Sequence, residues 1–212
     1  ALPHCGSVIP GEDEQRVARL LSKLRRTIEQ RARLLSTAGA LDIADYRRTH
    51  PAEPLPRLLV LLDSYAGFTD IYEKIDLGAL VEALPRLVAD GRNAGVHFVI
   101  TADRRTAVPS SITSLISRRL VLRMANEDEY TILGIDLREV RGAHLPAGRG
   151  FLDDGREVQV AVVGGSTEGG VQTAAVADLA ERLSARYPGP GAPAITAMPL
   201  EVPRTELPVP GE

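Results

Sequence analysis

The chain has 212 residues, of which 44% are hydrophobic and 25% are charged, a balance that is typical of a globular domain and excludes wholesale disorder. The formal net charge of −3 argues against a protein whose whole surface grips nucleic acid. No apolar run approaches the roughly 20 residues of a membrane-spanning helix, and residues 1–10 lack the features of a signal peptide. The single cysteine, Cys5, excludes an internal disulfide framework and fits a reducing compartment.

The first half of the chain predicts a long helix followed by a buried strand. Apolar residues recur every three or four positions over residues 14–38, which predicts an amphipathic helix that ends at Gly39. Residues 42–57 are polar and interrupted by proline, which predicts a short helix and a loop. Residues 58–62 are all apolar, which predicts a central parallel strand that helices cover on both faces.

The rest of the chain continues this alternation of helices and strands. The pattern predicts a helix over residues 77–90, which Pro85 can kink, then a buried strand over residues 96–100 and a third strand over residues 115–123. A short helix over residues 127–133, a hairpin over residues 151–163 and a closing amphipathic helix over residues 171–187 follow. Together these elements predict the α/β class, an open and mostly parallel sheet with a hairpin at one edge.

The last 25 residues predict an extended linker rather than a packed element. Residues 188–212 hold seven prolines, which disfavour helix and central strand. The expected organisation is therefore a domain over residues 1–187 and a linker over residues 188–212 that leads toward a further domain. We expect the domain to come from a longer polypeptide.

Two polar residues follow the predicted parallel strands, where α/β domains place their ligands. Asp63 ends the first apolar run, and Thr101 ends the second. An aspartate in this position can hold magnesium through water, and a hydroxyl can orient water or contact a phosphate. Either residue can also simply terminate its strand, and that structural interpretation stays open for both.

Several other chemistries are not supported by the sequence. No G-x-x-x-x-G-K-[ST] or G-x-G-x-x-G motif occurs, so no phosphate-cradling loop can be identified. The four histidines and one cysteine show no metal-ligand spacing, and nothing resembles a nucleophile elbow. Aromatic residues make up only 4%, which disfavours a base-stacking surface.

A family resemblance joins these features. Residues 2–8 and 29–35 resemble the segment between the two Walker motifs of FtsK/SpoIIIE-type ATPases, and residues 58–65 resemble their Walker B strand. Residues 91–104 resemble the glycine-flanked strand that follows in the family. The family's closing motifs are similar to residues 116–123, 133–134 and 145–150, and its linker between tandem ATPase domains is similar to residues 197–208. The chain looks like a module of type VII secretion ATPases or of related forkhead-associated proteins.

The resemblance implies a RecA-like P-loop fold that uses ATP and Mg²⁺ to move DNA or protein, as a ring or as tandem domains. It implies that Asp63 holds magnesium through water and that Thr101 lies near the γ-phosphate. Two departures qualify it: the Walker A strand and loop are missing from this sequence, and Ser64 replaces a second acid that usually polarises the attacking water. The resemblance therefore favours a degenerate or regulatory module over a working motor.

The same comparison assigns roles to three arginines. Arg31 lies where the family's helix carries an arginine that reaches a neighbouring nucleotide site, and Arg104 and Arg149 are further candidates for contacts to the nucleotide. The competing interpretation is that Arg31 belongs to the solvated face of its helix and that the other two form ion pairs.

Two classes of function remain after this comparison. The chain is either the ATP-binding part of a translocase or a catalytically silent domain that recognises a secretion substrate or a neighbouring ATPase. An unrelated Rossmann-like module ranks last, because its glycine fingerprint is missing. The expected location is the cytoplasm, with any membrane association through other parts of the parent protein.

Overall fold

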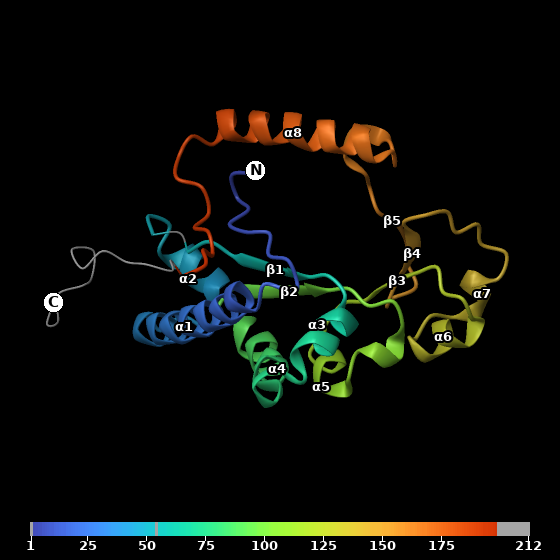
Figure 1. Cartoon of the computed structure of the whole chain (residues 1–212), viewed down its shortest axis with the longest axis horizontal. Helices are drawn as coiled ribbons and strands as arrows, with labels where there is room; N and C mark the ends of the chain where they lie inside the picture. The colour runs from blue at the N-terminus through green and yellow to red at the C-terminus, as the bar shows by residue number, and fades with distance from the viewer. Residues whose placement is uncertain (1, 54, 199–212) are drawn as a thin grey trace, which may run out of the picture.

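Two small β-sheets organise the chain in the computed structural model, which describes residues 2–53 and 55–198 (Figure 1). β1 (Leu58–Leu62) and β2 (Val96–Ile100) form a parallel pair in which each residue faces its counterpart, from Leu58 opposite Val96 to Leu62 opposite Ile100. The second sheet is antiparallel, in the order β3 (Leu120–Leu122), β4 (Arg149–Leu152) and β5 (Glu157–Gln159). The predicted third strand and hairpin therefore exist, but within the described residues they do not join the parallel pair.

The long first helix, α1 (Glu14–Ala38), confirms the prediction from the apolar spacing. The Asp13 side chain caps its first turn by accepting a hydrogen bond from the backbone N–H of Arg16, and Gly39 ends it at a φ of 64°. Its buried face lies on one stripe of the helix, with successive spacings of three or four residues: Leu21, Leu24, Ile28, Arg31 and Leu35. An arginine thus occupies a position of the apolar stripe.

The remaining helical segments are short, except for α4 and α8. They are, in chain order, α2 (Ile43–Thr49), α3 (Tyr65–Tyr72), η1 (Ile75–Gly78), α4 (Ala79–Gly91), η2 (Arg105–Ala107), α5 (Ser110–Thr113), α6 (Glu127–Ile132), α7 (Leu137–Val140), η3 (Val163–Gly165) and α8 (Gly169–Arg186). The helix expected over residues 77–90 is α4, which contains Pro85. The sequence prediction missed α3, which follows β1 directly.

The helices cover one face of the parallel pair. Buried side chains of α1, α3, α4 and α5 form a core with the inward residues of β1, which are Leu58, Val60 and Leu62. The alternate residues Leu59 and Leu61 point the other way and are 64% and 70% exposed. The expectation that helices cover both faces is therefore wrong for the described residues, because no element packs on the face that carries Leu59 and Leu61.

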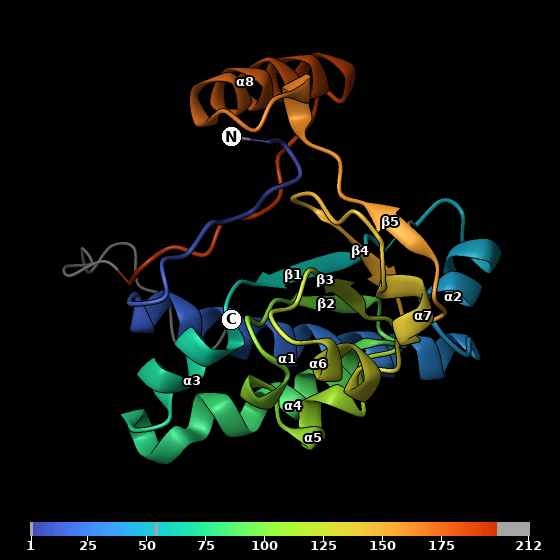
Figure 2. The same ribbon diagram turned by 90° about the vertical axis from the view of Figure 1, so that its right-hand side faces the viewer.

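A second core lies under the antiparallel sheet and joins β3, β4 and α6 through Val121, Phe151 and Tyr130. The closing helix α8 stands apart from both cores, on the side of the parallel pair opposite α1 and α4 (Figure 2). It packs mainly against η3 and buries none of its side chains. None of the helices in the described segments is long and apolar enough to cross a membrane.

Candidate functional site

Asp63 and Thr101 meet at the carboxyl ends of the parallel strands. Each residue follows the last residue of its strand, and the register of the pair places the two side by side. The hydroxyl of Thr101 donates a hydrogen bond to Asp63 Oδ1 at 2.6 Å. The backbone N–H of Thr101 also donates to the carbonyl of Leu62 at 3.0 Å, which continues the strand pairing as far as the site. The structure thus brings together the two residues that the sequence singled out.

Ser64 completes this arrangement through its backbone. Its N–H donates to Thr101 Oγ1 at 2.8 Å, so the Thr101 hydroxyl accepts one hydrogen bond and donates another. Ser64 has a φ of 63°, an uncommon conformation for a residue with a side chain, and its own Oγ caps α3 by accepting from the N–H of Gly67 at 3.1 Å. The chain therefore turns sharply after Asp63, and the first turn of α3 begins at the site.

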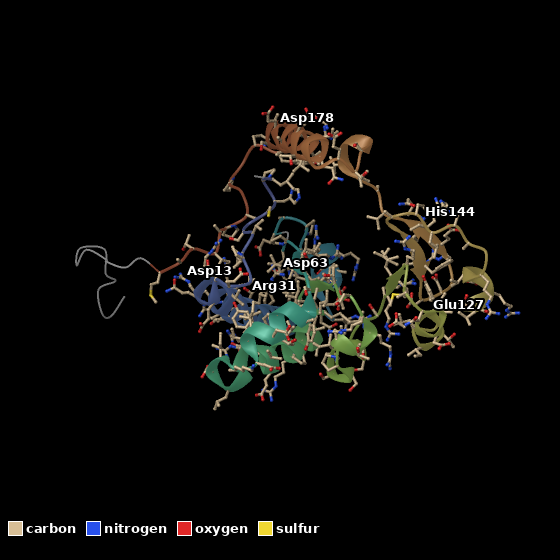
Figure 3. All side chains as sticks on the ribbon, turned by 45° about the vertical axis from the view of Figure 1, so that its right-hand side comes forward. Asp13, Arg31, Asp63, Glu127, His144 and Asp178 are labelled. Atoms are coloured by element: carbon tan, nitrogen blue, oxygen red, sulfur yellow. The ribbon has the colours of Figure 1, made fainter. Side chains whose placement is uncertain are left out.

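The site is open on its carboxylate side. Asp63 and Thr101 are both exposed, and Asp63 Oδ2 has no hydrogen-bond partner among the described residues. Figure 3 labels Asp63 together with Arg31. No cluster of three or more potential metal-ligating side chains occurs in the part of the chain that the structure describes. A magnesium ion at Asp63 would therefore need water and phosphate oxygens as its remaining ligands.

Arg31 lies at the opposite end of the same strands. Its Nη1 donates to the carbonyl of Ala94 and its Nη2 to the carbonyl of Pro56, both at 2.8 Å. These carbonyls lie two residues before the starts of β2 and β1, so the Pro56 carbonyl that Arg31 holds is about 23 Å from Asp63 at about 3.3 Å per strand residue. The side chain is 8% exposed, and desolvation lowers the pKa of its guanidinium.

This placement gives Arg31 a structural role within the chain. The expectation that Arg31 belongs to the solvated face of α1 is wrong, because that description fits Arg25, Arg26 and Arg33, which are exposed. A contact from Arg31 to a neighbouring subunit stays a prediction, and it requires the guanidinium to leave both carbonyls.

The other two arginines lie outside the Asp63–Thr101 pair. Arg104 follows Thr101 on the loop after β2 and is exposed, and its ion pair within the described residues is a long contact of 4.0 Å to Asp103. Arg149 lies on β4 of the other sheet, where it bonds to Gln159 at 3.1 Å and pairs with Glu157 at 3.2 Å. Arg104 can thus turn toward a ligand at little cost, whereas Arg149 already has partners on its own hairpin.

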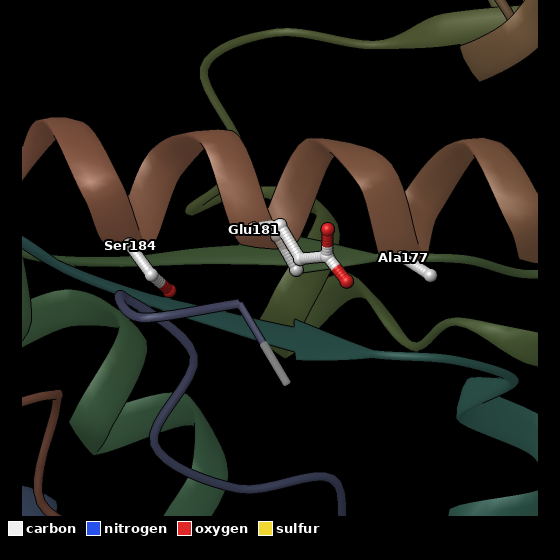
Figure 4. A pocket seen from close by; sticks show the side chains of 4 residues that line it. Ala177, Glu181 and Ser184 are labelled. Carbon is white, nitrogen blue, oxygen red and sulfur yellow. The ribbon is translucent and has the colours of Figure 1, made fainter.

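Apart from the Asp63–Thr101 pair, the described chain has a hollow on α8 (Figure 4). Its lining residues are Ala177, Ala180, Glu181 and Ser184, which supply one carboxylate and no basic group. Phosphates require cations or backbone N–H groups, so this hollow does not suit a nucleotide. The Asp63–Thr101 pair remains the candidate site.

A parallel pair with an acid and a hydroxyl at its carboxyl ends fits an α/β domain of the RecA-like P-loop ATPase class, and the solved structures that the chain resembles belong to that class. The structure superposes on the "Thermomonospora curvata EccC (ATPases 2 and 3) in complex with a signal sequence peptide" with a TM-score of 0.81 and 25% identity, over 98% of this chain and 37% of that one. It also resembles EssC (ATPases 2 and 3) from Geobacillus thermodenitrificans, with a TM-score of 0.78 at 18% identity, over 96% of this chain and 38% of that one.

The chain belongs to the FtsK/SpoIIIE family, whose model matches residues 1–155. It is 25% identical over 217 aligned positions to the ESX secretion system protein EccC of Thermomonospora curvata, which covers 98% of this chain and 16% of that protein. It is 26% identical to the ESX-4 secretion system protein EccC4 of Mycobacterium tuberculosis over 76% of this chain and 13% of that protein. The chain is therefore homologous to ATPase domains of type VII secretion proteins and spans a small part of their length.

Proposed function

We propose that this chain is a nucleotide-binding ATPase module of a type VII secretion ATPase whose hydrolytic step is weakened or lost. The observation that carries the proposal is the hydrogen bond between Thr101 and Asp63 at the carboxyl ends of β2 and β1. It fixes one carboxylate oxygen of the exposed Asp63 and leaves Oδ2 without a hydrogen-bond partner among the described residues, which is compatible with a water-mediated magnesium site.

The ligands that this site would take are ATP and Mg²⁺. Asp63 would hold the metal through water, and Thr101 would orient Asp63 and lie near the γ-phosphate. Arg104, on the adjacent loop, has a weakly held guanidinium for a phosphate, while Arg149 would first have to leave Glu157. When bound, Mg²⁺ bridges phosphate oxygens and neutralises their charge. No G-x-x-x-x-G-K-[ST] loop occurs in these 212 residues, so the proposal assigns the phosphate-cradling loop to residues outside them.

The residue after Asp63 supports weak or absent hydrolysis. Ser64 cannot act as the carboxylate base that polarises water, and its hydroxyl is already used to cap α3. Loss of a general base typically costs 10²–10⁴-fold in rate. We therefore propose a module that binds nucleotide and turns it over slowly, within tandem ATPase domains or a ring of copies.

A second candidate function is a catalytically silent domain that recognises a secretion substrate or a neighbouring ATPase. The apolar face of the parallel pair favours it, because Leu59 and Leu61 are largely exposed. A relative provides one precedent, since the Thermomonospora curvata EccC structure is a complex with a signal sequence peptide. Movement of DNA rests on the family resemblance alone.

Arg31 could contribute to ATP hydrolysis only at the nucleotide site of a neighbouring domain. As an arginine finger it would act on the nucleotide of a neighbouring domain, since Asp63 of its own chain lies at the other end of the strands. That movement would break the two hydrogen bonds that Arg31 donates to Ala94 and Pro56.

The test is a titration of fluorescent ATP with Mg²⁺ into the gene product that carries these 212 residues. Asp63→Asn should remove the saturable binding that this site contributes, whereas Asp90→Asn, the same change at an exposed aspartate near the end of α4, should preserve it. Equal binding by both variants would overturn the role of Asp63. Absence of binding at millimolar ATP in the folded protein would overturn the nucleotide site and favour the silent domain.

A further inference from the structure

The segment that follows α8 is docked on the N-terminal segment of the same chain. The backbone N–H of Ala192 donates to the carbonyl of Pro3 at 2.9 Å, and that of Ile195 donates to Ser7 Oγ at 2.7 Å. The Ile195 side chain is only 9% exposed. The two segments run side by side from α8 toward the start of α1 (Figures 1 and 2). We call residues 191–198 the C-terminal strap.

The first turn of α1 closes over the strap. Arg16 Nε donates to the carbonyl of Ile195 at 2.8 Å, and its Nη2 donates to the carbonyl of Val8 at 3.4 Å. One guanidinium thus holds both segments, while Asp13 pairs with Nη1 at 3.5 Å. The strap continues along the helix as far as Met198, whose N–H donates to Gln15 Oε1 at 3.1 Å.

The strap is the distal support of α8. This helix buries no side chain and packs mainly against η3 at its beginning. Its other end is joined to the strap by residues 187–190, so the contacts of Arg16 and Ser7 limit where that end can lie. Release of the strap would leave α8 attached at one end only.

A second set of contacts connects the start of α1 to the Asp63–Thr101 site. Helix α3 begins at Ser64, whose N–H bonds to Thr101, and ends at Tyr72. Tyr72 is 1% exposed, and its hydroxyl donates to the carbonyl of Gly11 at 2.6 Å, two residues before Asp13, the cap of α1. A shift of α3 at the site would therefore displace the loop before α1, and with it the position of Arg16.

We propose that the C-terminal strap is a releasable clasp, held by Arg16, which couples the position of α3 at the site to the position of α8. Its coupling to nucleotide rests on the proposed function. The docking of the strap and its dependence on Tyr72 do not, because both follow from contacts within the described residues.

The sequence allows a direct test in the full chain. Cys5 is the only cysteine and is exposed, and the chain has no tryptophan, so a bimane label on Cys5 would be quenched by Ala194→Trp when the strap is docked. Arg16→Ala should lower the ratio of docked to released strap by about tenfold, the effect expected for loss of one charge-assisted hydrogen bond. Arg19→Ala removes the same charge from an exposed position of α1 and should leave the quenching unchanged.

Two further measurements separate the strap from the nucleotide site. Tyr72→Phe should reduce the quenching without unfolding the chain, and unchanged quenching in this variant would overturn the coupling through α3. Trypsin cleavage after Arg186 in the unlabelled protein should accelerate in Arg16→Ala. Unchanged quenching and cleavage in Arg16→Ala would overturn the clasp. Failure of the protein to bind nucleotide would overturn the proposed function alone, because the strap assays contain no nucleotide.

Discussion

Thr101 fixes Asp63 by a hydrogen bond of 2.6 Å across the carboxyl ends of two parallel strands. The same hydroxyl accepts the N–H of Ser64, so a single side chain controls both the orientation of the carboxylate and the sharp turn that starts α3. Thr101 is therefore a positioning residue as the structure stands. Its two bonds make it the first residue to substitute.

Thr101→Val removes the hydroxyl and keeps the shape of the side chain. It leaves the Ser64 N–H without its acceptor and releases Asp63, so we expect a loss of about 1–2 kcal/mol in the free energy of unfolding and weaker binding of Mg²⁺-ATP by the gene product. Urea denaturation and the ATP titration measure the two effects. Thr101→Ser keeps the hydroxyl and should stay near the parent protein in both. If the valine variant bound nucleotide normally, Thr101 would not position Asp63.

Arg31→Ala removes the donor to the buried carbonyl of Ala94 and the donor to the part-buried carbonyl of Pro56. We expect a loss of about 2 kcal/mol in the free energy of unfolding, measured by urea denaturation. Arg33→Ala is the matched control, because Arg33 is exposed two positions further along the same helix. Full stability of Arg31→Ala, combined with reduced ATPase activity of the assembly, would instead indicate an arginine finger.

Gly95→Ala tests the packing of α2 on the loop before β2. Gly95 has a φ of 70°, and a Cβ there would lie 2.5 Å from Ile43 Cδ1. Gly134 has a similar φ of 87° with nothing within 4 Å, so Gly134→Ala carries the backbone strain without the clash. We expect losses of about 3 kcal/mol for Gly95→Ala and about 1 kcal/mol for Gly134→Ala by thermal or urea denaturation. Equal losses would contradict this close contact.

The Asp136 carboxylate, which caps α7, should become protonated only at low pH. Hydrogen bonds from Arg138 lower the pKa of Asp136 from 3.8 to about 2. Because the pKa in the folded state lies below that of the unfolded state, this carboxylate contributes stability above about pH 3.8, and the contribution is lost as the pH falls through about 2. A carboxyl NMR titration should show the low value, and Arg138→Ala should return it toward 3.8. An unshifted value in the parent protein would contradict the pairing.

The sequence predicted the elements whose signals are local. The helix of residues 14–38, its end at Gly39 and the strands at residues 58–62 and 96–100 all match the structure. The sequence also predicted the position of the candidate site, because Asp63 and Thr101 follow two strands. These strands pair residue for residue, from Leu58 opposite Val96 to Leu62 opposite Ile100. Local apolar patterns therefore carried both the elements and the site.

Local patterns do not determine which strands pair with one another. Whether residues 120–122 pair with β2 or with the hairpin is a nonlocal choice that apolar spacing does not encode. Two features had signals that the prediction missed: Tyr65, Phe68 and Tyr72 follow the helical spacing of α3, and Arg31 falls on the apolar stripe of α1. A charged residue on such a stripe is best interpreted as buried, with backbone carbonyls as its partners.

The bonds of Arg31 have a consequence for the order of folding. Helices form faster than contacts between segments that are distant in the chain, so α1 can be present before β1 and β2 pair. Its guanidinium then offers two donors that the carbonyls of Pro56 and Ala94 can reach together in the observed alignment. A slip of one residue would move one carbonyl by about 3.3 Å and break its bond. The two hydrogen bonds of Arg31 therefore favour the observed register of β1 and β2. Arg31→Ala should slow refolding as well as lower the stability of the native state.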